Sequence, residues 1–172
     1  MKFSELGYRR PDVARIEEDY KALIERVKKA ETDEEILDIW AAHQRLSTEF
    51  NLSDRTVYIR NTMNTKDEFY LGEKAYFNSV SPSYYNTQNQ LYKALLEHPK
   101  LQVLADKFGS ILPKKMQVAL DAADESVIDL QREDNALVQE YDELYASYMV
   151  EFEGKQMTLP QLAIYMMGGK DS

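Results

Sequence analysis

The residues of this sequence that could bind a metal ion or transfer a proton are two histidines and thirty acidic residues. His43 and His98 lie far apart in the chain, and neither belongs to an H-E-x-x-H motif. A catalytic zinc site usually takes three protein ligands, commonly histidines with a carboxylate. The chain has no cysteine, which excludes disulfides and thiolate metal sites. We therefore predict no catalytic residue, no bound metal and no cofactor in this chain.

Other chemical motifs are also missing from the sequence. It contains no G-x-S-x-G, no P-loop and no G-x-G-x-x-G. Acidic runs such as Glu133-Asp134 fall on expected helix faces, which is typical of solvated surfaces. His43 shares an apolar face with Trp40 and Phe50, which favours a buried, hydrogen-bonded histidine over a metal ligand. The same pattern predicts that Trp40 is largely buried.

Charge and hydropathy exclude two classes of partner. The formal net charge is −9, whereas binding to nucleic acid needs a basic face. No apolar run approaches the ~20 residues that span a bilayer. The first ten residues contain no apolar stretch typical of a signal peptide. We expect no nucleic acid or membrane partner, and a cytoplasmic location.

Apolar residues recur at three- and four-residue spacings along most of the chain, which is typical of helices. The pattern predicts one all-α domain, a multi-helix antiparallel bundle-like array with one small β-hairpin near the C-terminus. The expected helices are about 11–30, 33–64, 66–79, 82–97, 100–108, 113–122 and 127–147, followed by a hairpin at 148–158 and a last helix at 159–167.

Several of these boundaries depend on local signals. Thr32 with Glu35, and Thr65 with Glu68, each have the form of a capping box at a helix start. Ser126 is an expected N-cap, and Gly109 an expected left-handed cap. Residues 51–54 either interrupt the second helix or lie within it, and the sequence leaves both readings open.

Two further signals concern the middle and the end of the chain. Ser81-Pro82 predicts the start of a new helix. Glu153-Gly154 predicts the turn of the hairpin, because these residues allow positive φ. In the helix expected at 66–79, one face is aromatic and includes a single acidic residue: Phe69, Tyr70, Glu73, Tyr76 and Phe77.

Five sequence blocks follow one another along nearly the whole chain: FSELGYRRPDV, IRNTMNTKDEFYLGEKAYFNSVSP, LYKALLEHPKLQVLADKFG, VIDLQREDNALVQEYDELYAS and VEFEGKQMTLPQL. Their order and spacing resemble the N-terminal region of oligoendopeptidase F-type zinc metallopeptidases, the relatives of thimet oligopeptidase. Two positions depart from the family pattern. The segment STEFNLSD at 47–54 is short, and Asn61 stands where a histidine is more usual.

The resemblance implies a helical enzyme that cleaves short peptides inside a deep cleft. It places the zinc-binding H-E-x-x-H helix in a later part of the sequence, so this chain would be an inactive N-terminal region that forms one cleft wall. Zinc is implied for the full-length parent only. The implied partners are the missing catalytic part and, through the parent, an oligopeptide substrate. Tyr58, Arg60 and Asn64 are candidate cleft-facing residues, against the simpler reading of ordinary surface or interhelix packing.

The alternative function is a free-standing helical protein-interaction module without enzymatic activity, which would bind a partner helix along its tyrosine-rich face. A third reading is an enzyme with an unrecognised carboxylate site. An in-frame H-E-x-x-H downstream of Ser172 would favour the peptidase. Apolar residues of the last helix and the tyrosines before the hairpin predict an uncovered surface, and with it weak self-association or binding to the catalytic part. These residues are Leu162, Tyr165, Met166, Met167, Tyr145 and Tyr148.

Overall fold

The computed structural model describes residues 7–123 and 128–167, which form seven helices and one two-stranded antiparallel hairpin. The all-α, bundle-like fold class predicted from the sequence is confirmed. The elements are α1 (Val13–Lys29), α2 (Asp33–Met63), α3 (Glu68–Leu96), α4 (Gln102–Phe108), α5 (Ile111–Asp121), α6 (Ile128–Ser147), β1 (Met149–Phe152), β2 (Lys155–Thr158) and α7 (Leu159–Met166). None of the helices in these ranges is long and apolar enough to cross a membrane.

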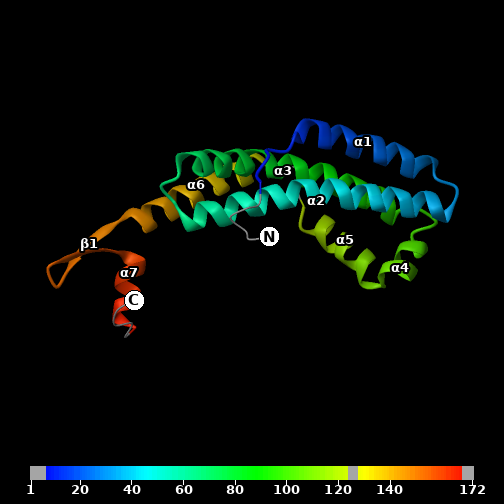
Figure 1. The fold of residues 1–172 in the computed structure, drawn as a ribbon. Coiled ribbons are helices and arrows are strands. Elements are labelled where there is room, and N and C mark those ends of the chain that lie inside the picture. The colour runs from blue at the N-terminus through cyan, green and yellow to red at the C-terminus, as the bar shows by residue number, and fades with distance from the viewer. Residues whose placement is uncertain (1–6, 124–127, 168–172) are drawn as a thin grey trace.

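Three long helices form the body of the molecule (Figure 1). α1, α2 and α3 pack against one another, and the short helices α4 and α5 pack against one end of α2 and α3. α6 lies along α3 and then extends beyond the bundle, where it carries the hairpin and α7. We call residues 128–167 the distal arm.

The hydrophobic core lies where α1, α2 and α3 meet, and α4 and α5 each add one side chain to it. At its centre the rings of Phe50 and Tyr84 stack with their centroids 3.7 Å apart. The sixteen core residues are Val13, Ile16, Tyr20, Leu23, Val27, Ile36, Ile39, Trp40, Phe50, Val57, Phe77, Tyr84, Leu91, Leu95, Leu104 and Met116. Among the described side chains of the distal arm, none is buried.

The first capping box predicts the start of α2 correctly. The Thr32 hydroxyl accepts a hydrogen bond from the Glu35 amide at 3.3 Å, and the Glu35 carboxylate accepts one from the Thr32 amide at 2.9 Å. α2 then continues through residues 51–54 without interruption and ends at Met63. The structure therefore settles the reading that the sequence left open.

The second expected capping box, Thr65 with Glu68, is wrong. The N-cap of α3 is Asp67, whose carboxylate accepts hydrogen bonds from the amides of Phe69 and Tyr70 at 3.0 and 3.3 Å. Aspartate ranks above threonine as a capping residue. Because Asp67 is the N-cap, the helix starts two residues later than a Thr65 cap would require.

The expected helices 66–79 and 82–97 are in fact one helix. α3 runs from Glu68 to Leu96 and has Pro82 in its interior. A proline inside a helix removes one hydrogen bond and crowds the carbonyl four residues before it, here that of Asn78. The side chain of Asn135 on α6 donates to this carbonyl, at 3.4 Å. A residue distant in the sequence thus donates to the carbonyl that the proline leaves without a helical donor.

The hairpin forms as its turn residues predict. Glu153 and Gly154 have φ values of 51° and 74°, and Val150 pairs with Met157 in the strand register. Thr158 then caps α7. Gly109, the expected left-handed cap, has a φ of 93°. The expected cap Ser126 lies outside the described residues.

Candidate functional site

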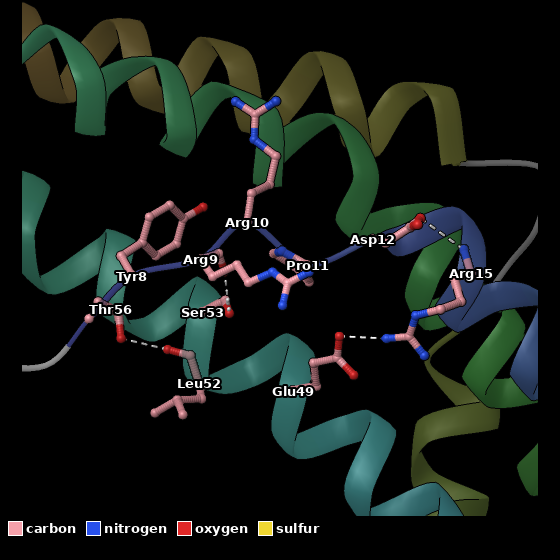
Figure 2. A pocket seen from close by; sticks show the side chains of 11 residues that line it. Tyr8, Arg9, Arg10, Pro11, Asp12, Arg15, Glu49, Leu52, Ser53 and Thr56 are labelled. Atoms are coloured by element: carbon pink, nitrogen blue, oxygen red, sulfur yellow. Dashed lines mark hydrogen bonds and ion pairs between the residues drawn. The ribbon is translucent and has the colours of Figure 1, made fainter.

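Residues 7–12 precede α1 and lie across α2 without forming a helix or strand (Figure 2). We call them the N-terminal strap. The middle of the strap is held on α2 by Ser53, whose hydroxyl donates to the Arg9 carbonyl at 3.2 Å. At the end of the strap Asp12 caps α1 by accepting from the Arg15 amide at 3.1 Å. The strap thus connects the start of α1 to the middle of α2.

A buried carboxylate on α3 holds the strap from the opposite side. The Glu73 side chain is only 6% exposed and accepts hydrogen bonds from the guanidinium of Arg10, including one from Nε at 3.0 Å, and from the hydroxyl of Tyr8. The bonds from Arg10 hold the pKa of Glu73 below its ordinary value. Burial, and then the bond to Glu73, raise the pKa of Tyr8. A carboxylate that stays ionised beside a tyrosine that stays protonated is suited to anchoring rather than to proton transfer.

A depression of about 630 Å³ lies between the strap and α2. Figure 2 shows that Arg10 points away from it toward α3, while Arg15 and Glu49 face each other across it. Arg15 is paired with Glu49 at 2.5 Å and with Asp19 at 2.7 Å. Since Ser53 is also engaged, the lining offers neither an activated nucleophile nor a cluster of free ligands.

His43 is a buried, hydrogen-bonded histidine, as predicted. It is 4% exposed, and its Nδ1 and Nε2 lie 3.1 and 3.4 Å from the hydroxyls of Tyr20 and Tyr92. Burial lowers its pKa to about 4. His98 lies apart from it, with Nε2 3.2 Å from the carbonyl of Ala30. Across residues 7–123 and 128–167, no three His, Asp or Glu side chains are close enough together to hold a metal ion. The residues that the structure describes therefore do not fit a zinc site.

The three candidate cleft residues lie on the last two turns of α2 and at its end. Arg60 donates a hydrogen bond to the hydroxyl of Tyr70, and its guanidinium carbon lies 5.3 Å from the centre of that ring. Asn64 is the C-cap of α2, and Tyr58 is 54% exposed. At ~100° per residue, Arg60 and Asn64 share one side of the helix, and Tyr58 points about 160° away from Arg60. The structure brings two of the three candidates together and separates the third.

The distal arm exposes a large apolar surface. Its exposed apolar residues are Leu130, Leu137, Val138, Tyr141, Leu144, Tyr145, Tyr148, Met149, Ile164, Tyr165, Met166 and Met167. The uncovered surface expected from the sequence is confirmed at the two tyrosines before the hairpin and at the last three of these residues, whereas Leu162 is half-buried. Groups of large exposed apolar side chains are typical of interaction surfaces.

Sequence reasoning missed the strap anchor formed by Tyr8, Arg10 and Glu73. The available signal was Glu73 itself, the one acidic residue on an otherwise aromatic helix face. An acidic residue in such a position needs a partner, because burying an unpaired charge is costly. The sequence does not say which of twenty-one lysines and arginines supplies that partner.

Comparison with known proteins agrees with this architecture. The sequence model of one protein family, the peptidase M3 N-terminal domain, matches residues 3–123, which include α1 to α5. No protein of the curated set matches the chain.

Three solved structures share the fold. PZ peptidase A with inhibitor 2 is 31% identical, with a TM-score of 0.89 over 94% of this chain and 29% of that chain. A protein assigned as an oligoendopeptidase F is 28% identical, with a TM-score of 0.90 over 96% of this chain and 29% of that chain. Another so assigned, from Bacillus anthracis str. Ames, is 27% identical, with a TM-score of 0.90 over 99% of this chain and 31% of that chain. The chain spans less than a third of the length of each.

Proposed function

Because the chain belongs to the peptidase M3 family, through that family's N-terminal domain, we propose that it is the non-catalytic region of a zinc-dependent oligoendopeptidase. In this proposal it forms one wall of the cleft in which a cytoplasmic enzyme hydrolyses short peptides. The observation that carries the proposal is the match of nearly the whole chain, at TM-scores of 0.89 and 0.90, to under a third of each peptidase.

The chemistry of the chain supports a non-catalytic role. Its two histidines are engaged with tyrosine hydroxyls and a backbone carbonyl, and its buried carboxylate Glu73 is paired with an arginine. Neither arrangement leaves a base or a metal ligand free for hydrolysis. We assign zinc and the residues that activate water to the part of the peptidase that lies outside these 172 residues.

The exposed face of the distal arm is the surface that we assign to contact with that other part. Leu137, Tyr141 and Leu144 recur at helical spacing on α6 and are 61–65% exposed. Burying apolar surface stabilises an interface by about 25 cal/mol per Å². Association of two separate chains costs several kcal/mol that a single chain does not lose, so we expect micromolar affinity between the separated parts.

The cleft-facing role of Tyr58, Arg60 and Asn64 is part of the same proposal. Arg60 is positioned by the ring and hydroxyl of Tyr70, and Asn64 lies one turn further on the same side. These two residues could hydrogen-bond a peptide backbone or its carboxylate. Tyr58 would contact the peptide from a different direction.

Reconstitution from two chains tests the proposed function. The 172-residue chain is mixed with the separately expressed downstream part of the parent, and a quenched peptide reports zinc-dependent cleavage. We expect sedimentation velocity to show a complex and cleavage to appear only in the mixture. Leu144→Asp on the exposed face should weaken both, whereas Glu140→Gln, an exposed polar change on α6, should not.

Two results would overturn the proposal. A folded downstream part that is fully active alone would remove the need for this region. A chain that stays monomeric and does not bind the downstream part would favour the free-standing interaction module, which would bind a partner helix along its tyrosine-rich face.

A further inference from the structure

The interior proline of α3 leaves one backbone carbonyl of this helix without its helical hydrogen-bond donor. Pro82 has no N–H to donate, and its ring crowds the carbonyl of Asn78. A backbone carbonyl that loses its helical donor needs another partner when water does not reach it freely. Asn78 is half-buried, so water has only partial access to this part of α3.

α6 supplies donors at this place. The side-chain amide of Asn135 donates to the Asn78 carbonyl at 3.4 Å, and Nε of Arg132 donates to the Ser79 carbonyl at 3.1 Å. The two donors are three residues apart, which places them on the same face of α6. Both therefore reach α3 from one orientation of the helix.

A side-chain network fixes the same contact further along. The side-chain nitrogen Nδ2 of Asn78 donates to Oε1 of Gln139 at 2.8 Å. The side-chain nitrogen Nε2 of Gln139 in turn donates to the Glu143 carboxylate at 2.9 Å, which orients the glutamine with its side-chain oxygen toward α3. One turn before Asn78, Lys74 lies 3.5 Å from the carboxylate of Asp142. From Lys74 to Ser79 on α3, the contacting residues of α6 run backward from Asp142 to Arg132, so the two helices are antiparallel.

The polar character of this contact distinguishes it from the rest of the fold. α1 to α5 share the buried core, whereas no described side chain of α6 is buried, and the large apolar ones among them are exposed. Little apolar burial therefore determines where α6 sits on α3. The position and rotation of α6 on α3 therefore depend mainly on hydrogen bonds, which are directional.

We propose that Asn78, Ser79 and Pro82 form a docking notch on α3. This notch recognises Arg132 and Asn135 of α6 and thereby sets the orientation of the whole distal arm. The proline leaves the Asn78 carbonyl without its helical donor, and Asn135 donates to it instead. Arg132 donates to the neighbouring Ser79 carbonyl. The hairpin and α7 follow α6 directly along the chain, so the angle at the notch decides where their apolar surface faces. This inference depends on the contacts between α3 and α6 and does not depend on the proposed peptidase function.

Distance measurement between two spin labels tests the notch in the 172-residue chain. The sequence has no cysteine, so cysteines introduced at Lys21 on α1 and Gln156 on β2, both exposed, are the only labelling sites. The double variant R132M/N135L removes both α6 side-chain donors, because methionine and leucine have no N–H to donate. Pro82→Ala restores a helical N–H to the Asn78 carbonyl and removes the crowding ring. Glu140→Ala is the matched control on α6.

We expect a single narrow distance distribution in the unsubstituted chain and in the control, and a clearly broader one in both test variants. Hydrogen exchange of the α6 amides should be about tenfold faster in the double variant, because two hydrogen bonds of ordinary net strength are lost. The variants should keep the folded α1 to α5 core, to which α6 contributes no described side chain. An unchanged distribution in either the double variant or Pro82→Ala would overturn the proposal.

Discussion

Arg10 of the strap and Glu73 of α3 form an ion pair across 63 residues of sequence, in which the guanidinium is 52% exposed and the carboxylate 6% exposed. The pair is therefore asymmetric. Loss of the arginine leaves a buried charge without its cationic partner, whereas loss of the glutamate charge leaves a cation that water can reach. This asymmetry makes the two ends of the pair distinguishable by mutation.

We predict that Arg10→Ala destabilises the protein more than Glu73→Gln does. An unpaired buried charge costs about 3 kcal/mol, and loss of hydrogen bonds to a group that stays solvated costs about 1–2 kcal/mol. Urea unfolding of both variants measures the difference. Arg15→Ala removes an arginine whose ion pairs are half-exposed and should cost less than about 1 kcal/mol. Equal losses for the two ends of the pair would contradict the asymmetry.

The start of α3 gives a second prediction. Asp67→Ala should cost about 1 kcal/mol, because it leaves the amides of Phe69 and Tyr70 without their capping acceptor. Thr65→Ala should change stability little, since Thr65 is exposed and precedes the cap. Thermal and urea unfolding would compare the two. A larger loss for Thr65→Ala would restore the capping box that the sequence first suggested.

Trp40 is the one tryptophan in the sequence and is 6% exposed, with its ring centre 4.5 Å from that of His43. We predict a blue-shifted emission maximum in the native protein and a loss of about 3–5 kcal/mol for Trp40→Ala, the usual cost of removing a large aromatic from a core. Trp40→Phe should cost less, because it keeps a ring in the site. A water-like native emission spectrum, or an unchanged denaturation midpoint for Trp40→Ala, would show that the burial is wrong.

The histidine in the core makes stability depend on pH. His43 has a pKa of about 4 in the folded protein, below its ordinary value of 6.5. Between these values the unfolded chain binds a proton that the folded chain does not, so stability is full above pH 6.5 and falls as the pH drops toward 4. We predict a loss of about 2 kcal/mol between pH 7.5 and 5.0 from this residue.

Urea unfolding at the two pH values, with variants, isolates the effect. His43→Gln should be less stable at pH 7.5 but should lose little more at pH 5.0. His98→Gln keeps the core histidine and should retain the pH dependence of the unsubstituted chain. A pH dependence that survives His43→Gln would assign it to other groups.

Metal binding is the last prediction. Because the donor groups in residues 7–123 and 128–167 do not cluster, we expect calorimetry to show no submicromolar, one-to-one zinc binding. A quenched-peptide assay should likewise show no zinc-dependent cleavage by the chain alone. Either signal would require a site that the described residues do not contain.

The sequence by itself determined the features that depend on neighbours in the chain. Helical periodicity, the Thr32–Glu35 capping box, the positive φ at Gly109 and the hairpin turn at Glu153-Gly154 are set within a few residues. The apolar pattern also placed Trp40 and His43 in the core, because the apolar face of an amphipathic helix packs toward the protein interior. The resemblance in five blocks then indicated the family.

Only the tertiary structure decided the features that depend on distant partners. The sequence predicted a helix boundary at Ser81-Pro82, yet α3 passes through it, and Asn135 of α6 donates to the carbonyl that the proline leaves without a helical donor. The partner of Glu73 could not be read from the sequence, because any of many cations could have met it. The extent of the exposed surface on the distal arm is a further example. The sequence predicted an uncovered surface at the last helix and at Tyr145 and Tyr148, whereas the structure shows that Leu137 and Leu144 of α6 are exposed as well, because no described part of the chain packs over that face.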